Sequence, residues 1–285
     1  MKRIVVGFSG GVTSAWCAGW AKRTFPNDRV ILLWHDTKEE HPDTYRFLHE
    51  MAARLELPIT ERSDGRSVTE VFRDEGFLGN NQNAMCSRIM KRDQGDRFIS
   101  ECHSELLAEW YPGWPATSTP FRDVEDIARR SEDAKDLVAR LWLSVVMVFG
   151  FSANEPDRVQ RAAARGMANG FTARFPLIEE NVSKQQAADW CSCTMGVRPS
   201  AMYAWSGHAN CVGCVKGGKE YWLAVAENAP EVFAQRVALE EEFGHGILRG
   251  GGREHHLLKD LVQIGMKRRA PRREAIEIGP CECGD

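Results

Sequence analysis

Residues 4–14 have the sequence IVVGFSGGVTS. The apolar run at residues 4–8 predicts a short buried strand, and a helical pattern follows it up to Arg23. Between them, Gly10 and Gly11 permit a tight turn and a close approach of the backbone to a ligand. The first N–H groups of a helix have no partner within it, so this turn is suited to an anion such as phosphate. The turn lacks the lysine of a P-loop, and a turn without a ligand stays open as a second interpretation.

Further apolar runs alternate with helical patterns along the chain; they lie at residues 30–34, 58–60, 143–151 and 171–178. This alternation predicts an α/β fold with a doubly wound, mainly parallel sheet flanked by helices. Ligands of such a sheet bind at the carboxyl ends of its strands, where the glycine-rich turn lies. We expect a nucleotide-binding domain over residues 1–215 with a proline-rich insertion near residues 103–132, and a helical C-terminal extension over residues 216–285.

The composition is that of a globular protein. Of the 285 residues, 43% are hydrophobic and 27% are charged, and the formal net charge is -3. These values exclude collagen-like, coiled-coil and disordered chains, and they give no sign of a strongly basic nucleic-acid-binding protein. No apolar run approaches the ~20 residues of a membrane helix, and no signal-peptide pattern is seen. We therefore expect a cytoplasmic protein that does not associate with membranes.

The cysteines are numerous and clustered. Nine are present, and an odd number in a cytoplasmic protein argues against a disulfide framework. Cys211 and Cys214 form a C-x-x-C motif, a spacing with which two thiolates hold an iron–sulfur cluster or zinc. A redox dithiol without metal is a third interpretation. The remaining close pairs are C-x-C motifs, Cys191 with Cys193 and Cys281 with Cys283.

Further motifs follow the glycine-rich turn S-G-G-V-T-S in a fixed order. They are D-T at residues 36–37 with P-D-T-Y-R-F at residues 42–47, C-S-R-I-M-K at residues 86–91, and F-P-L-I at residues 175–178 with C-V-G-C at residues 211–214. Together they resemble the phosphoadenosine phosphosulfate (PAPS) reductase branch of the PP-loop superfamily, the N-type ATP pyrophosphatases. The resemblance covers residues 4–215 and implies the adenine nucleotide alpha hydrolase-like fold.

Two residues depart from the family pattern. Thr13 stands where many ATP pyrophosphatases have an aspartate that helps to hold pyrophosphate and Mg²⁺, which leaves the metal arrangement open. Cys86 stands alone, after Met85, where the family has paired cysteines. The segment around the C-x-x-C looks more like the phage and bacterial proteins called PAPS reductase-like than like the PAPS reductases themselves.

The resemblance implies an adenine nucleotide, ATP or PAPS, with Mg²⁺ for ATP. The residues implied in nucleotide binding are Ser9, Gly10, Gly11, Thr13, Ser14, His35, Asp36, Thr37, Arg88 and Lys91. It also implies a 4Fe–4S cluster or zinc. The expected metal ligands are Cys86, Cys211, Cys214 and, as a fourth, Cys193 or a cysteine of the tail.

Two residues are candidates for catalysis. Arg158 follows the strand expected at residues 143–151, so it is placed to hold a phosphate or sulfate; its alternative is a solvated helix face. Glu282-Cys283-Gly284 resembles the C-terminal E-C-G of PAPS reductases, which carries their nucleophilic cysteine. Cys283 is therefore the expected nucleophile, although a tail cysteine could equally ligate metal.

The function expected first is ATP-dependent adenylation, with release of pyrophosphate, coupled to sulfur transfer through a cysteine-ligated iron–sulfur cluster. The alternatives are a thiol-dependent reductase of PAPS or adenosine phosphosulfate, and a nucleotide-binding regulatory module with structural zinc. The expected partners are a sulfur donor or thiol carrier protein. A nucleic acid or nucleobase as the acceptor, a small metabolite as the acceptor, and oligomer formation all stay open.

Overall fold

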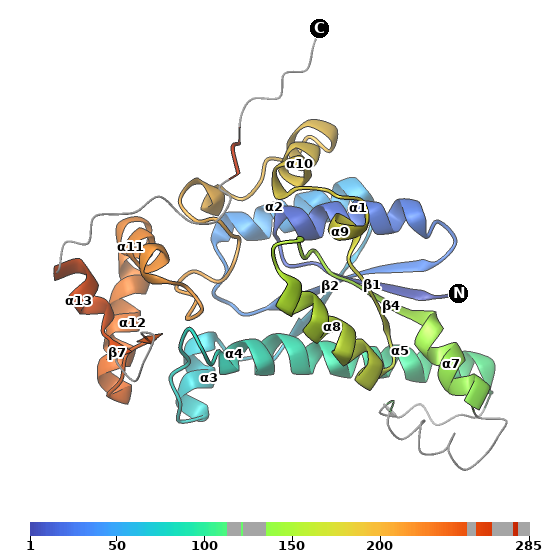
Figure 1. The fold of residues 1–285 in the computed structure, drawn as a ribbon, viewed down its shortest axis with the longest axis horizontal. Coiled ribbons are helices and arrows are strands. Elements are labelled where there is room, and N and C mark those ends of the chain that lie inside the picture. Colours follow the sequence, from blue (N-terminus) through green and yellow to red (C-terminus); the bar gives the residue numbers. More distant parts are fainter. Residues whose placement is uncertain (113–120, 122–134, 250–254, 264–275, 279–285) are drawn as a thin grey trace, which may run out of the picture.

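The computed structural model shows an α/β fold built on one parallel sheet (Figure 1). The structure describes residues 1–112, 121, 135–249, 255–263 and 276–278. The sheet has five strands in the order β3-β2-β1-β4-β5. Their bounds are β1 Arg3–Gly7, β2 Arg29–Asp36, β3 Ile59–Ser63, β4 Val145–Val148 and β5 Thr172–Arg174. The predicted doubly wound α/β fold is confirmed, and the strand order reverses direction between β1 and β4, where such sheets bind ligands.

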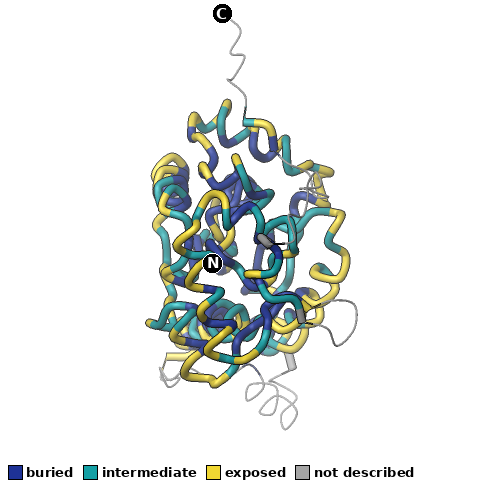
Figure 2. Tube along the Cα trace, turned by 90° about the vertical axis from the view of Figure 1, so that its left-hand side faces the viewer, coloured by how far each residue is buried: buried dark blue, intermediate teal, exposed yellow. Residues whose placement is uncertain are grey.

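Helices cover both faces of this sheet, because successive side chains of its strands point to opposite sides. Ile4 and Val6 of β1 face one core and Val5 faces the other. The first face is covered by α1 Val12–Thr24, α2 Pro42–Leu55, α9 Pro176–Glu179 and α10 Lys184–Asp189. The second is covered by α5 Gln94–Trp110, α7 Lys135–Ser144 and α8 Pro156–Asn169. Figure 2 shows buried positions concentrated between these layers.

Two strands are shorter than the sequence predicts. The run at residues 143–151 contributes only β4, because α7 extends to Ser144 and the chain leaves the sheet at Gly150. The run at residues 171–178 contributes β5 and then turns into α9. Pro176 explains this second difference, since its fixed backbone angle and missing N–H suit the first turn of a helix better than a strand.

The C-terminal helices pack around a third core. They are α11 Lys219–Asn228, α12 Pro230–Phe243 and α13 Leu258–Gln263, next to the short pair β6 Leu248–Arg249 and β7 His255–His256. This core also contains Val68 and Phe72 of α3 Val68–Asp74 and Met90 of the helix that follows. The third core therefore joins the expected C-terminal extension to the segment after β3.

Two turns of π-helix interrupt the regular helices. The first, η1 Arg88–Asp93, joins α4 Met85–Ser87 to α5, and the second, η3 Trp190–Thr194, follows α10. A 3-10 turn, η4 Ala201–Ala204, comes before the C-x-x-C motif. Within the part of the chain that the structure describes, no helix is both long and apolar enough to cross a membrane. Most of the expected insertion, residues 113–120 and 122–132, and the tail with Cys281 and Cys283 lie outside the described residues.

Candidate functional site

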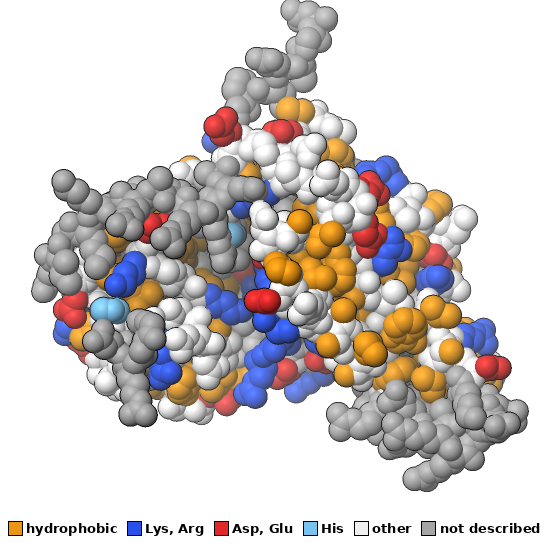
Figure 3. All heavy atoms as spheres, viewed as in Figure 1, with side chains coloured by type: hydrophobic (Ala, Val, Ile, Leu, Met, Phe, Trp, Pro, Cys, Tyr) orange, Lys and Arg blue, Asp and Glu red, His pale blue; other side chains and the backbone are white. Residues whose placement is uncertain are grey.

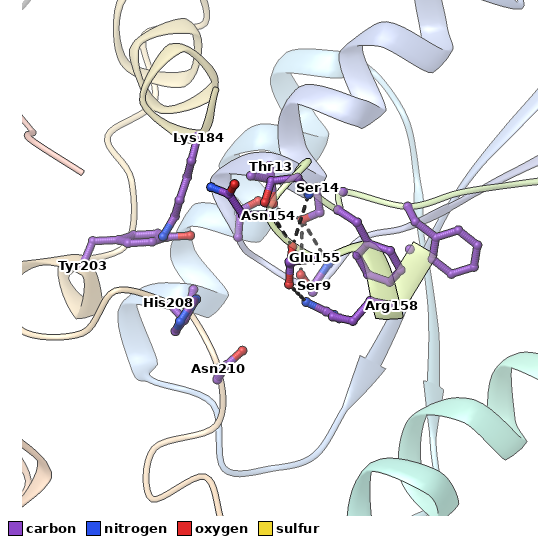
Figure 4. Close-up of a pocket in the computed structure, with 17 residues that line it drawn as sticks. Ser9, Thr13, Ser14, Asn154, Glu155, Arg158, Lys184, Tyr203, His208 and Asn210 are labelled. Carbon is purple, nitrogen blue, oxygen red and sulfur yellow. Dashed lines mark hydrogen bonds and ion pairs between the residues drawn. The ribbon is translucent and has the colours of Figure 1, made fainter. Parts of the chain in front are cut away.

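A cavity of about 550 Å³ lies at the carboxyl ends of β1 and β4 (Figure 4). Three parts of the chain form its wall: the glycine-rich turn, the segment after β4, and residues 184–210. The residues that line it are Gly7, Ser9, Gly11, Thr13, Ser14, Phe149, Gly150, Phe151, Ser152, Asn154, Glu155, Arg158, Lys184, Tyr203, His208, Ala209 and Asn210. Its position between β1 and β4 is the ligand-binding position that the strand order predicts.

The glycine-rich turn is shaped by close backbone contacts. Gly10 has a φ of +75°, and a Cβ there would lie 2.5 Å from Thr44 Cγ2. Ser14 Oγ donates a hydrogen bond of 2.8 Å to the carbonyl of Gly11 and accepts one of 3.2 Å from the N–H of Ser9. Helix α1 begins after Gly11 with no side-chain cap and no acidic residue in its first turn. These features leave the positive end of the helix open to an anion in the cavity.

The segment after β4 supplies a charged and an aromatic wall. The Arg158 guanidinium lies 4.1 Å from the centre of the Phe151 ring and forms an ion pair with Glu155. Burial by itself would raise the pKa of Glu155, but the charge and hydrogen bond of Arg158 outweigh it and lower this pKa. Glu155 is therefore a carboxylate at neutral pH, and its charge already has a partner.

A group of buried and half-buried thiols lies behind the third part of the wall; Cys86, Cys211 and Cys214 are called here the thiol site. Cys211 directly follows Asn210 of the cavity wall, and its Sγ lies 3.1 Å from Thr37 Oγ1 and 3.5 Å from Glu40 Oε1. Burial and then the charge of Glu40 raise the pKa of Cys211 well above its usual value. Burial and then the charge of Cys214 raise the pKa of Cys86 to about 11. Cys214 is thus within electrostatic range of both Cys86 and Cys211.

Lys91 neutralises negative charge at the thiol site. Its Nζ lies 3.2 Å from Oε1 of Glu40, whose side chain is only 2% exposed. Burial by itself would lower the pKa of Lys91, but the charges of Cys211 and Glu40 outweigh it and raise this pKa. Oε2 of Glu40 is buried and has no hydrogen-bond partner within the part of the chain that the structure describes.

The C-x-x-C turn is held in place by distant residues. Arg236 of α12, 1% exposed, donates to the Gly213 carbonyl at 3.2 Å and to Thr69 Oγ1 at 2.9 Å, and forms an ion pair with Glu39. The Glu39 carbonyl accepts a hydrogen bond of 2.7 Å from the N–H of Val212. The turn is therefore fixed against the chain that follows β2.

Tyr221 fastens the same turn from α11. Its hydroxyl donates to the Cys211 carbonyl and accepts from the Cys214 N–H, both at 3.0 Å. These two bonds close the turn between the cysteines, so their spacing is fixed by backbone contacts as well as by the ion pair of Arg236.

Residues 3–139 match the family model of the phosphoadenosine phosphosulfate reductase domain. This match supports a PAPS reductase-like member of the PP-loop superfamily. This confirms the resemblance seen in the motifs, and it implies adenine-nucleotide binding and sulfonucleotide-related activity. No curated protein matches the chain. The matched residues include the glycine-rich turn and Cys86, whereas the third part of the cavity wall and the C-x-x-C follow them.

The structure divides the expected nucleotide-binding residues into two groups. Ser9, Gly11, Thr13, Ser14 and the expected catalytic Arg158 line the cavity, and Gly10 shapes the turn beneath it. The others do not line the cavity. Among these, Thr37 and Lys91 belong to the surroundings of the thiol site.

The remaining expected residues lie elsewhere at the carboxyl edge of the sheet. Asp36 Oδ1 accepts hydrogen bonds of 2.8 Å from the Tyr45 hydroxyl and the Lys38 N–H, so it holds the turn after β2. Burial, and then the charge of Lys91, lowers the pKa of His35 to about 4, and its Nε2 lies towards Gly95 of α5. Arg88 is exposed on η1, where Figure 3 shows Lys and Arg side chains gathered between α4 and α8.

The expected metal ligands are only partly grouped. Among the described residues, no three His, Cys, Asp or Glu side chains are placed closely enough to hold a metal ion. Cys193, the first choice for a fourth ligand, is disulfide-bonded in the structure. Cys17, Cys102 and Cys191 are free and buried in the cores.

Several residues of both sites were not singled out from the sequence. They are Glu39, Glu40, Lys184, Tyr203, His208, Asn210 and Arg236. Glu39 and Glu40 lie between two recognised motifs and could have been noticed for that reason. Arg236 stands in an ordinary helical pattern, and nothing near it in the sequence indicates a contact with Gly213.

Proposed function

We propose that this protein is a thiol-dependent reductase of an adenine sulfonucleotide, PAPS or adenosine phosphosulfate. One observation carries the proposal: Ala209 and Asn210 belong to the cavity wall, and the buried thiol of Cys211 is the next residue. A nucleotide in the cavity would therefore lie next to the thiol site.

In the proposed complex, the phosphate lies at the N-terminus of α1. The backbone N–H groups of the turn and the hydroxyls of Ser9 and Thr13 would bind its oxygens. Arg158, on the opposite wall, would approach the sulfate end and offset its charge. The neighbouring Phe149 and Phe151 limit the access of water to that side.

The proposed reaction consumes two thiols. A thiolate attacks the sulfur of the sulfonucleotide, the bond from sulfur to the phosphate oxygen breaks, and the nucleotide leaves with that electron pair. A second thiol then attacks the enzyme cysteine, which releases sulfite and forms a disulfide. A thiol carrier protein reduces the disulfide. Cys283 of the tail is the proposed nucleophile, and deletion of residues 281–285 tests this role by abolishing turnover while nucleotide binding is kept.

A second reaction, ATP-dependent adenylation coupled to sulfur transfer, is supported by the glycine-rich turn and by the hydroxyls of Thr13 and Ser14. It requires Mg²⁺, which is usually held by one or two carboxylates together with the phosphates. Glu155 is the one carboxylate among the described residues that line the cavity, and its charge is already paired with Arg158 in an ion pair. This pairing makes the cavity better suited to the reductase reaction.

A cluster or zinc at the thiol site belongs to the same proposal, although the described thiols do not form a ligand group as they stand. Anaerobic purification followed by absorbance and by iron and zinc analysis distinguishes a 4Fe–4S cluster, a zinc site and free thiols. Structural zinc together with nucleotide binding, but without turnover, would instead support a regulatory module.

The decisive experiment incubates the purified protein with PAPS or adenosine phosphosulfate and a thiol reductant, and in parallel with ATP and Mg²⁺. Sulfite from the first mixture supports the reductase, and pyrophosphate from the second supports adenylation. Gly10→Ala should weaken nucleotide binding, because its Cβ would lie 2.5 Å from Thr44 Cγ2. Gly218→Ala is the control, since nothing lies within 4 Å of a Cβ there.

A further inference from the structure

Tyr203 belongs to the cavity wall but follows the residues that match the family. It lies in η4, which is fastened to the start of α2: Asp43 Oδ2 accepts a hydrogen bond of 2.7 Å from the Ala201 N–H, and Thr44 Oγ1 lies 2.9 Å from Ser200 Oγ. The side chain of Tyr203 is buried, with 8% of the residue exposed. Its position is therefore fixed by the fold before any ligand binds.

The hydroxyl of Tyr203 lies at the N-terminus of α1. It accepts a hydrogen bond of 3.2 Å from the Val12 N–H, and a Cβ on Gly11 would lie 3.3 Å from it. Ala209 belongs to the same cavity wall. Figure 4 shows this hydroxyl pointing towards the glycine-rich turn, with Lys184 beside the ring.

These contacts determine where the hydroxyl hydrogen can go. A phenol oxygen has one hydrogen to donate, and here the Val12 N–H already donates to one of its lone pairs. Among the described residues, no acceptor takes that hydrogen, and the open side of the oxygen is the cavity. Burial raises the pKa of Tyr203 to about 12, so the phenol keeps its hydrogen at neutral pH.

We propose that Tyr203 is a further binding residue of the nucleotide site, which donates its hydroxyl hydrogen to a phosphate oxygen bound at the N-terminus of α1. The inference rests on the proposed nucleotide site and adds a donor that no motif indicates. It also gives the segment before the C-x-x-C a direct contact with the ligand, because Tyr203 and Asn210 line the same cavity.

The test compares ATP, PAPS and adenosine by calorimetry, or by ligand-observed NMR for weak binding, on the full chain. Tyr203→Phe removes one oxygen and keeps the ring, so affinity for ATP and PAPS should fall about tenfold, the effect of one hydrogen bond to a charged group. Affinity for adenosine, which has no phosphate, should stay unchanged. Tyr221→Phe is the control, because its hydroxyl also binds backbone groups but does not line the cavity.

Three results would overturn the inference. Unchanged affinity for ATP and PAPS would show that the hydroxyl does not contact the ligand. An equal loss for adenosine would show that Tyr203 only shapes the cavity. A gain in ATP affinity would show that the hydroxyl competes with phosphate for the Val12 N–H. Failure of the wild-type protein to bind ATP or PAPS would instead refute the proposed function, whatever the variant does.

Discussion

The serine hydrogen bonds that shape the glycine-rich turn at residues 9–14 are local, whereas the C-x-x-C turn takes its position from charged side chains elsewhere in the chain. Ser14 bonds only to Ser9 and Gly11 within the turn. The C-x-x-C turn depends on Arg236 and on Glu39, which are 197 residues apart in sequence. Changes in the first turn should therefore affect ligand binding, and changes around the second should affect folding.

The largest effect is expected from Arg236→Met. It leaves the carboxylate of Glu39, whose side chain is 17% exposed, without its cation, and removal of one partner of a buried pair costs about 3–5 kcal/mol. Denaturant unfolding should show this loss. Arg73→Met is a matched control, because Arg73 of α3 forms an exposed ion pair with Glu242, which lies on α12 like Arg236, and exposed pairs contribute much less to stability than buried ones. Equal losses in the two variants would contradict the comparison.

The sheet region should show its own dependence on pH. Burial lowers the pKa of His103 from 6.5 to about 4, and the side chain is fully buried. Between these pH values the unfolded chain binds a proton that the folded chain does not, so stability is full above pH 6.5 and falls as the pH drops towards 4.

Unfolding measured from pH 7 to pH 4 checks this expectation. Between pH 7 and pH 4, the free energy of unfolding of His103→Gln should fall by roughly 1–3 kcal/mol less than that of the wild type. His49→Gln, at an exposed position, should leave the pH dependence unchanged. An identical pH profile for wild type and His103→Gln would show that other groups, such as His35, account for the loss.

Gly213→Ala should give a smaller effect confined to the thiol site. Gly213 has a φ of +74°, and a Cβ there would lie 2.7 Å from Val232 Cγ1. Such strain costs about 1–3 kcal/mol, and it should also change the rate at which the cysteines react with a thiol reagent. ATP affinity should stay at the wild-type value. A variant with weakened ATP binding would show that the two turns are more tightly coupled than their contacts indicate.

The smallest effect is expected from Asp36→Ala. Asp36 holds the turn after β2 through Tyr45 and Lys38 and does not line the cavity. Loss of these exposed or half-buried bonds should change ATP affinity less than about threefold, which corresponds to under 1 kcal/mol. A loss as large as that of Gly10→Ala would assign Asp36 to the nucleotide site, as the motif resemblance implies.

The sequence predicts the sheet and the glycine-rich turn because both depend on local patterns. A run such as Ile4–Val6 followed by glycines specifies a buried strand and a tight turn with little help from the rest of the chain. The strand ends were less predictable. Residues 171–178 could continue as a strand or, as the structure shows, turn into a helix that begins at Pro176. The cavity's third wall and the ion pairs of the thiol site were not predicted, because long-range contacts such as that of Arg236 with Gly213 leave no local signal.

The π-helical turn η1 accommodates an extra residue in the helical segment that leads into α5. An α-helix turns by about 100° per residue. An extra residue that no wider turn accommodates would therefore rotate the preceding helical segment relative to the following one. Because η1 runs directly into α5 and a π-helical turn holds one more residue than an α-helical turn, deleting one residue between Arg88 and Asp93 would convert η1 to regular α-helical winding. The length of the C-S-R-I-M-K segment between Cys86 and α5 is therefore tied to this π-helical turn.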